Sequence, residues 1–259
     1  MVAYNLAAKF HQKGIAVSTV APAVTPEIVK SIAPSGTLLV TLNCGNTVLV
    51  QGTPDAPSGV TVDLSRELAR RLGVPVKFHP FPGAGEAFEG FSNQKLDIVF
   101  LAIEPVRAAQ VEFTPPYVII EGVYMVWKDS ALKSVADVDR AGVRIGVTVK
   151  AAYELFLTRS LKAATLVRAD DGVQAFVDQK LDAAGGVKQQ IVARSKALPD
   201  TKVLDGRFME IRQAMGTQKG REVGSAYLKA FIEEMKASGF VADALKRANQ
   251  PEATVAPPA

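Results

Sequence analysis

The sequence predicts an α/β protein of two lobes, with two strands that cross between the lobes. From about Gly36, short β-rich segments alternate with amphipathic helical segments, an order typical of largely parallel sheets. The segment YVIIEGVYMVWK (117–128) is a long β-rich run without a turn signal, long enough to leave one lobe and enter another. The segment FMEIRQAMGT (208–217) is also strand-like and would bring the chain back.

The chain has 259 residues, of which 48% are hydrophobic and 22% are charged. This composition is that of a folded protein with a substantial core. We expect a signal-like or flexible leader at 1–35 and a disordered Pro/Ala tail at 251–259. Between them, we expect a first lobe built from 36–120 and 209–250, and a second lobe built from 121–208.

In the first lobe, the segment TLLVTL (37–42) predicts the first strand. A helix follows in DLSRELARRLG, because Leu64, Leu68 and Leu72 share one face and Gly73 is placed to end it. The strand VPVKFH, a short helix in AFEGFSNQKL and the strand DIVFLAI complete this series.

The second series repeats the first in outline. It begins with the strand VRIGVTV (143–149) and a helix, continues with the strand ATLVRA and another helix, and then has the strand LDAA and a helix from about Lys188. The last predicted helix is Glu222–Ala237, ended by Gly239. Ligands of open α/β sheets bind at the carboxyl ends of the strands, so both lobes would offer these ends to one cleft.

Several classes of site are excluded by the residue types. Basic residues are scattered despite a net charge of +4, and Arg70-Arg71 is the longest basic run, so we expect no nucleic-acid partner. The single cysteine, Cys44, excludes an internal disulfide and a multi-cysteine zinc site. No nucleophile–His–acid set, Walker loop or metal-ligand cluster is visible, so we expect no metal and no cofactor.

Four segments together resemble the family 3 extracellular solute-binding proteins, the periplasmic amino-acid-binding type. They are GVTVDLSRELARRLGVPVKF (59–78), KLDIVFLAIEPVRAAQVEFTPPYV (95–118), LKSVADVDRAGVRIGVT (132–148) and LDAAGG (181–186). The resemblance implies the type II periplasmic-binding-protein-like fold, with two crossing strands at the hinge. It also implies a monomer that binds a small anionic or zwitterionic solute and serves an ABC permease.

The leader bears on where such a protein acts. Lys9 and Lys13 precede GIAVSTVAPAV, which is similar to a short, weakly hydrophobic signal segment. The resemblance therefore implies a periplasmic location. A flexible leader and a cytoplasmic location are the alternatives.

Arg107 is the leading candidate for ligand contact. In the family that this chain resembles, the arginine at this position after a first-lobe strand commonly holds a ligand carboxylate. A guanidinium suits that role because it is permanently charged and offers a planar pair of donors. The alternative is that Arg107 only pairs with Glu104 or Glu112 on the surface.

Other candidates surround this position. Asn43 and Asn46 follow the first strand, where hydrogen-bonding groups would meet a ligand, although turn formation is an equal explanation. Ala102 stands where the family often has a small hydroxyl residue. In the second lobe, Lys150 and Ala151 stand where the family often has Gly-Thr-Thr at a helix start, a seat for an anion.

A departure from the family concerns the ligand ammonium. The resemblance places an acidic residue shortly after the strand LDAA, but GGVK (185–188) stands there. An ordinary α-amino acid would lose its expected ammonium partner, so the ligand is expected to be an amino-acid-like or organic acid.

The main alternative function is a lyase of the cyclohexadienyl dehydratase type on the same fold. Glu121 or Glu104 would then donate a proton, and Arg107 and Lys150 would hold carboxylates. In a binding protein, the Glu121 carboxylate could instead contact the ligand by positioning a ligand hydroxyl. A third possibility, an extracytoplasmic sensor module, differs only in its partner.

Overall fold

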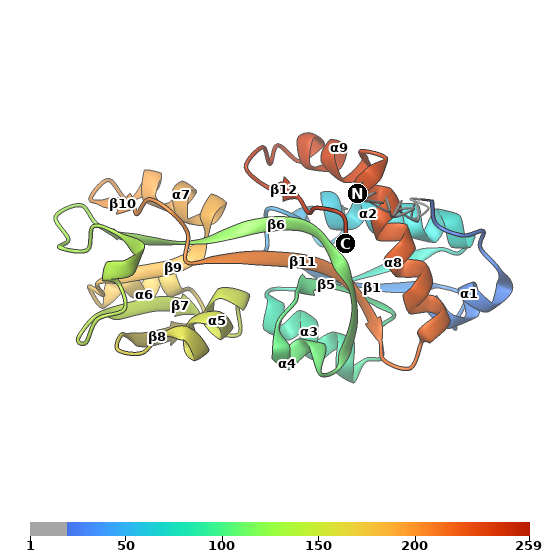
Figure 1. Ribbon diagram of the computed structural model, residues 1–259, viewed down its shortest axis with the longest axis horizontal. Helices are drawn as coiled ribbons and strands as arrows, with labels where there is room; N and C mark the ends of the chain where they lie inside the picture. Colours follow the sequence, from blue (N-terminus) through green and yellow to red (C-terminus); the bar gives the residue numbers. More distant parts are fainter. Residues whose placement is uncertain (1–19) are drawn as a thin grey trace, which may run out of the picture.

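The computed structural model describes residues 20–259, in which two groups of elements are joined by two long strands (Figure 1). The strands are β1 (Leu38–Asn43), β2 (Gln51–Gly52), β3 (Pro57–Ser58), β4 (Val76–Phe81), β5 (Ile98–Ala102), β6 (Val111–Trp127), β7 (Arg144–Thr148), β8 (Thr165–Ala169), β9 (Ala183–Val187), β10 (Thr201–Val203), β11 (Met209–Gln218) and β12 (Thr254–Val255). The helices are α1 (Pro26–Ile32), α2 (Val60–Leu72), α3 (Ala84–Asn93), α4 (Pro105–Ala108), the 3-10 turn η1 (Val135–Asp137), α5 (Ala152–Ser160), α6 (Gly172–Asp178), α7 (Lys188–Ala197), α8 (Glu222–Ala237) and α9 (Phe240–Arg247).

Both groups share one sheet, which has ten strands in the part of the chain that the structure describes. Its order is β4-β1-β5-β11-β6-β9-β7-β8, and β10 and β12 pair with β6. We call the group around β1 the first lobe and the group around β7 the second lobe. β6 and β11 cross between the lobes, as the β-rich segments 117–128 and 208–217 predicted.

The lobes repeat one pattern. In the first, β1 lies between β4 and β5, parallel to both, and β11 is antiparallel to β5. In the second, β7 lies between β8 and β9, parallel to both, and β6 is antiparallel to β9. In each lobe, one of the two crossing strands therefore pairs antiparallel with the edge of the parallel strands: β11 in the first lobe and β6 in the second.

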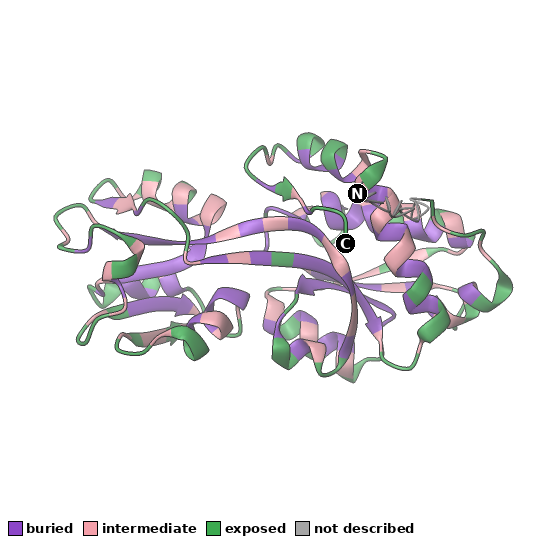
Figure 2. Ribbon diagram, in the orientation of Figure 1, coloured by how far each residue is buried: buried purple, intermediate pink, exposed green. Residues whose placement is uncertain are grey.

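Apolar stripes explain why the helices pack on this sheet. Leu64 and Leu68 of α2 have no exposed surface, and α2 ends at Gly73, whose φ of 68° favours glycine. α8 buries Leu228 and Phe231 in the same way, over the bounds that the sequence predicted. Figure 2 shows the strands largely buried and the outward helix faces exposed.

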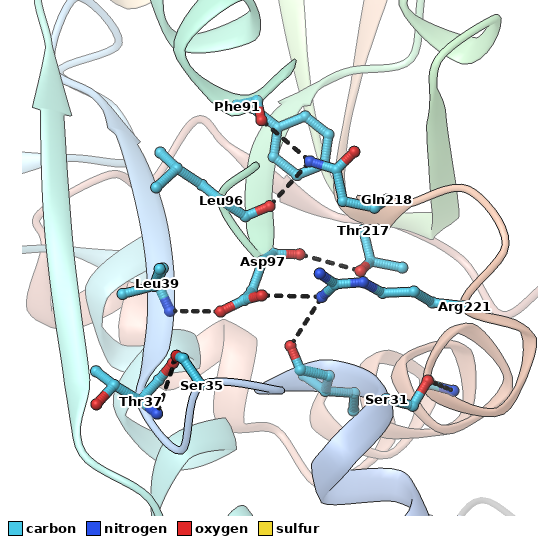
Figure 3. A network of polar contacts seen from close by, with 12 residues as sticks. Ser31, Ser35, Thr37, Leu39, Phe91, Leu96, Asp97, Thr217, Gln218 and Arg221 are labelled. Carbon is cyan, nitrogen blue, oxygen red and sulfur yellow. Dashed lines mark hydrogen bonds and ion pairs between the residues drawn. The ribbon is translucent and has the colours of Figure 1, made fainter. Parts of the chain in front are cut away.

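A buried ion pair secures the first-lobe end that lies away from the second lobe (Figure 3). The Asp97 side chain is 3% exposed, and its carboxylate accepts from the Leu39 amide at 3.0 Å and from Arg221 Nη1 at 2.9 Å. Arg221 Nη1 also donates to the Ile32 carbonyl at 3.0 Å, while Thr217 Oγ1 donates to the Asp97 carbonyl at 3.0 Å. These bonds join α1, β1, β5 and the β11–α8 connection.

Both chain ends differ from the expectation. Residues 26–32 of the expected leader form α1. Thr25 caps this helix, Pro26 occupies its first position, and the helix buries its apolar side chains Ile28 and Ile32. The expected disordered tail instead contributes β12, which pairs with β6, and the Ala256 amide donates to the Tyr117 carbonyl at 3.0 Å. Most of the signal-like segment lies in residues 1–19, outside the described residues.

Within residues 20–259, no helix combines the length and apolar character needed to cross a bilayer.

The Asp97–Arg221 pair provides a first prediction. Arg221→Met would leave a buried carboxylate without its cation, so the free energy of unfolding should fall by about 2–4 kcal/mol in urea denaturation. Arg247→Met is the control, since Arg247 makes an exposed ion pair with Asp63 and should change stability by less than about 0.5 kcal/mol. Equal, small effects of both substitutions would contradict this account.

A second prediction concerns acid stability. The bond from Arg70, aided by Arg71, lowers the pKa of Glu67 from 4.5 to about 2, and Arg71 also pairs with Glu234 of α8 at 2.8 Å. A lowered folded-state pKa means that the stabilisation is complete above pH 4.5 and is lost as the pH falls toward 2.

The corresponding test compares the wild type with Glu67→Gln. The wild type should be more stable at pH 7, and the difference should shrink as denaturation is measured from pH 5 down to pH 2. A difference that stays constant over this range would show that the carboxylate is not responsible.

Candidate functional site

A cavity of about 790 Å³ lies between the lobes, where the carboxyl ends of their parallel strands meet. The first lobe lines it with residues in or after the carboxyl ends of β1, β4 and β5. The second lobe lines it with residues in or after the carboxyl ends of β7, β8 and β9, and β11 adds Ile211 and Gln213. The meeting of strand ends at one cleft was predicted from the sequence. Among the predicted site residues, those that line the cavity are Asn43, Asn46, Ala102, Arg107 and Ala151.

Arg107 is held at this cavity by the local structure after β5. Glu104 precedes α4, Pro105 occupies its first turn, and this single turn carries Arg107 back toward the strand end. Its Nη1 donates to the Ala102 carbonyl at 3.3 Å, and its Nη2 donates to the Lys150 carbonyl of the second lobe at 3.0 Å. The residue is only 2% exposed.

Among residues 20–259, the charge of Arg107 has no carboxylate partner in an ion pair. Burial lowers its pKa to about 10, against the opposing effect of Glu104, so the guanidinium stays protonated at neutral pH. Within residues 20–259 no acidic side chain forms an ion pair with it. Glu104 pairs with Arg159 and Glu112 pairs with Lys229, so the alternative of a surface pair for Arg107 is wrong.

Asn43, the last residue of β1, and Asn46 form a tight turn at the cavity. The Asn46 amide donates to the Asn43 carbonyl at 3.1 Å. The Oδ1 atoms of both side chains are buried without a hydrogen-bond partner among the described residues. Gly45, between them, packs so closely that a Cβ would lie 2.6 Å from the Pro82 carbonyl oxygen. Cys44 is half-buried and does not line this cavity.

Beside Ala102, β11 places a polar side chain that the sequence analysis did not single out. Gln213 is the register partner of Ala102, is 5% exposed and lines the cavity. The β6–β11 register shifts directly after it. The alternation of side chains between the two faces of a strand could have identified Gln213 from the segment FMEIRQAMGT. It places Ile211 and Gln213 on the same face, and both line the cavity.

In the second lobe, Lys150 contributes backbone rather than side chain. Its φ of 59° is in the left-handed region, unusual for a non-glycine residue, and its carbonyl accepts from Arg107. Its ammonium instead bonds Glu89 of α3 at 2.5 Å, and Lys150 does not line the cavity. Ala151 does line it, as the residue that precedes α5.

Charged residues after β8 and in α7 also line the cavity and were missed by the sequence analysis. Asp171 accepts from the Val173 and Gln174 amides at 2.9 and 3.0 Å and pairs with Arg194 of α7 at 3.1 Å. Its neighbour Asp170 lines the cavity as well. Their position directly after the strand ATLVRA is the signal that could have identified them.

The two candidate proton donors lie outside the cavity lining. Glu121 in β6 binds Lys188 and Arg207, each at 2.9 Å, and the Lys188 bond most strongly lowers its pKa. A general acid at neutral pH needs the opposite shift. Glu104 is 2% exposed and is paired with Arg159.

Direct polar contacts connect the lobes across the cavity. Glu104 of the first lobe pairs with Arg159 of α5 at 2.5 Å. Gln190 of α7 donates to the Gly45 carbonyl at 2.7 Å. Together with the bond from Arg107 to Lys150, these contacts hold the lobes against each other.

The family model that matches residues 49–249 describes bacterial extracellular solute-binding proteins, family 3. The chain belongs to this family. Its α/β architecture with two crossing strands is accordingly the type II periplasmic-binding-protein fold, as the sequence predicted.

Individual relatives are distant. The chain is 24% identical over 200 residues to the L-cystine-binding protein TcyJ of Escherichia coli, covering 73% of each. The ancestral amino acid-binding protein AncCDT-1, a precursor of cyclohexadienyl dehydratase, is 22% identical with a TM-score of 0.70, over 85% of this chain and 97% of that one. A putative ABC-transporter binding component from Wolinella succinogenes, complexed with lysine, is 24% identical with a TM-score of 0.70, over 82% and 95%.

The Glu104–Arg159 pair yields a prediction on lobe contact. Arg159→Gln leaves the buried Glu104 carboxylate without its partner, so the free energy of unfolding should fall by about 1–3 kcal/mol. The ligand-free protein should also show a larger radius of gyration by small-angle X-ray scattering. The control is Arg140→Gln, because Arg140 pairs with Asp137 inside the second lobe. An unchanged radius in Arg159→Gln would contradict a role of this pair in holding the lobes together.

Proposed function

We propose that this protein captures an amino-acid-like solute by its carboxylate in the cavity between the lobes. The observation that carries this proposal is Arg107, a buried and protonated guanidinium at the cavity without a carboxylate partner among residues 20–259. A solute carboxylate would supply the missing anion through charge-assisted hydrogen bonds. Asn43, Asn46 and Gln213 would contribute further hydrogen bonds to the same solute.

The named relatives support an amino acid as the solute class. One is an L-cystine-binding protein, and another was crystallised with lysine. Both solutes carry the carboxylate that Arg107 requires. The proposal names no single amino acid, because identity to these relatives is 24%.

We propose that the protein delivers its solute to an ABC permease, a role that the hinged architecture supports. Binding energy from both lobes is available only when they meet, so the solute selects the closed arrangement. A permease that reads this arrangement would receive the solute outside the cytoplasm. We propose that the protein acts there as a monomer, and a sensor role would differ only in the partner that reads closure.

We propose binding rather than lyase activity. The dehydratase alternative needs a proton donor at the solute, but Glu121 is held in two ion pairs outside the cavity lining and Glu104 is paired with Arg159. Turnover of prephenate or arogenate by the purified protein would overturn this choice.

The Arg107 variants test the carboxylate site. Isothermal titration calorimetry against a panel of L-amino acids and of the matching amines without the carboxylate should give binding only to the acids. Arg107→Ala should weaken the best ligand by about 100-fold or more, and Arg107→Lys by about tenfold, because lysine retains the charge without the planar fork.

Two controls accompany this test. Arg70→Ala removes a side chain that is 70% exposed in α2 and should leave affinity unchanged. Urea denaturation of the ligand-free variants separates lost binding from lost folding. Full affinity in a folded Arg107→Ala protein would overturn the proposed site.

A further inference from the structure

One residue of the second lobe, Lys150, makes three separate contacts with the first lobe. Its carbonyl accepts from Arg107 Nη2 at 3.0 Å, and its ammonium bonds Glu89 of α3 at 2.5 Å. Between these two ends, its aliphatic stem lies against Gly85 of α3, where an added Cβ would be 2.6 Å from Lys150 Cδ and 2.7 Å from Lys150 Cβ. Because α3 and α5 lie on facing sides of the lobes (Figure 1), the turn before α5 docks on the first lobe through this lysine.

The backbone of Lys150 has an unusual conformation. Its φ of 59° is one that L side chains rarely adopt, and the bond from the Ala151 amide to the Thr148 carbonyl, at 3.3 Å, closes the turn that holds it. Glycine would avoid the steric cost of this conformation. The chain has a lysine here, and the left-handed turn directs its carbonyl toward Arg107. Strain that the surrounding structure maintains in this way is typical of functional sites.

The hydrogen bonds of Arg107 leave room for a solute. Its Nη1 donates to the Ala102 carbonyl of the first lobe, and its Nη2 donates to the Lys150 carbonyl of the second. The guanidinium carries further N–H groups in the same plane, so it can bind both carbonyls and a carboxylate together. Since each lobe supplies one carbonyl, the guanidinium has both bonds only while the lobes meet.

From these contacts we infer that Lys150 is a positioning residue, which orients Arg107 for the solute carboxylate as the lobes close. This inference rests on the proposed function and deepens it. Lys150 does not line the cavity, so it acts on the solute through Arg107. Carboxylate binding and lobe closure are thereby coupled, because both hold the same guanidinium in the same orientation.

A simpler explanation is that Lys150 is an exposed turn residue with a solvated ammonium. The Lys150 and Glu89 side chains are 53% and 51% exposed, and ion pairs of this kind contribute little. Under that explanation the lysine stem would move aside freely, and affinity for the solute would not depend on the space at Gly85. That space is therefore the feature to change.

The test fills the space at Gly85. This glycine does not line the cavity, and the three heavy atoms nearest to an added Cβ all belong to Lys150. Gly85→Ala should displace the turn and weaken solute binding by about tenfold, while α3 stays folded because alanine favours a helix. Lys150→Gly removes the stem but allows the left-handed turn, so it should bind within about threefold of the wild type. The Gly85→Ala/Lys150→Gly double variant should recover that level.

Calorimetric titration of the full-length protein measures these affinities. The probe is the tightest binder among the standard L-amino acids and L-cystine. Gly85→Ala in the Arg107→Ala background should change affinity by less than about twofold, because Lys150 acts through Arg107. Gly73→Ala is the control, since it adds a Cβ in open space at the end of α2 and should leave affinity unchanged. Urea denaturation should show that each variant is folded.

The outcomes distinguish this inference from the proposed function. If the folded Gly85→Ala protein binds the probe as tightly as the wild type, the inference is overturned and the carboxylate site stands. An equal loss with and without Arg107 would show that the added methyl group hinders closure alone, which also overturns the inference. Absence of binding by the whole panel would instead overturn the proposed function.

Discussion

The structure around the cavity depends on one buried positive charge. Removing a guanidinium from water costs several kcal/mol unless hydrogen bonds and an opposite charge compensate for it. Arg107 donates one hydrogen bond to the Ala102 carbonyl of its own lobe and another to the Lys150 carbonyl of the other lobe. No acidic side chain among residues 20–259 forms an ion pair with Arg107, and we propose that a bound anion completes this arrangement.

The sheet explains how the two halves of this site are brought together. β6 pairs with β11 along the first lobe and with β9 in the second, so one continuous strand passes through both. The lobes then touch through side chains, Glu104 with Arg159 and Gln190 with the Gly45 carbonyl. Hinge rotation at the crossing strands can break and remake contacts of this kind, and the function proposed above has a solute bias the arrangement of the lobes in this way.

Local patterns were enough to predict the longer strands, most helices and the position of Arg107 after a strand, but not β2, β3 or α9. They failed at α1 and β12, because a seven-residue helix and a two-residue strand owe their structure to packing on α8 and pairing with β6, not to their own periodicity. They also missed Gln213 of β11 and Asp171 after β8, since these residues come from separate parts of the chain and line one cavity only in the folded sheet. Lys150 was expected to offer its side chain, and its left-handed backbone offers the carbonyl instead.

The most direct test is a crystal structure of the protein with a bound amino acid, obtained by soaking or by co-purification without refolding. The account predicts the solute between the lobes, with its carboxylate oxygens about 3 Å from the Arg107 guanidinium nitrogens. A solute bound elsewhere, or in the cavity with its carboxylate turned away from Arg107, would contradict the account.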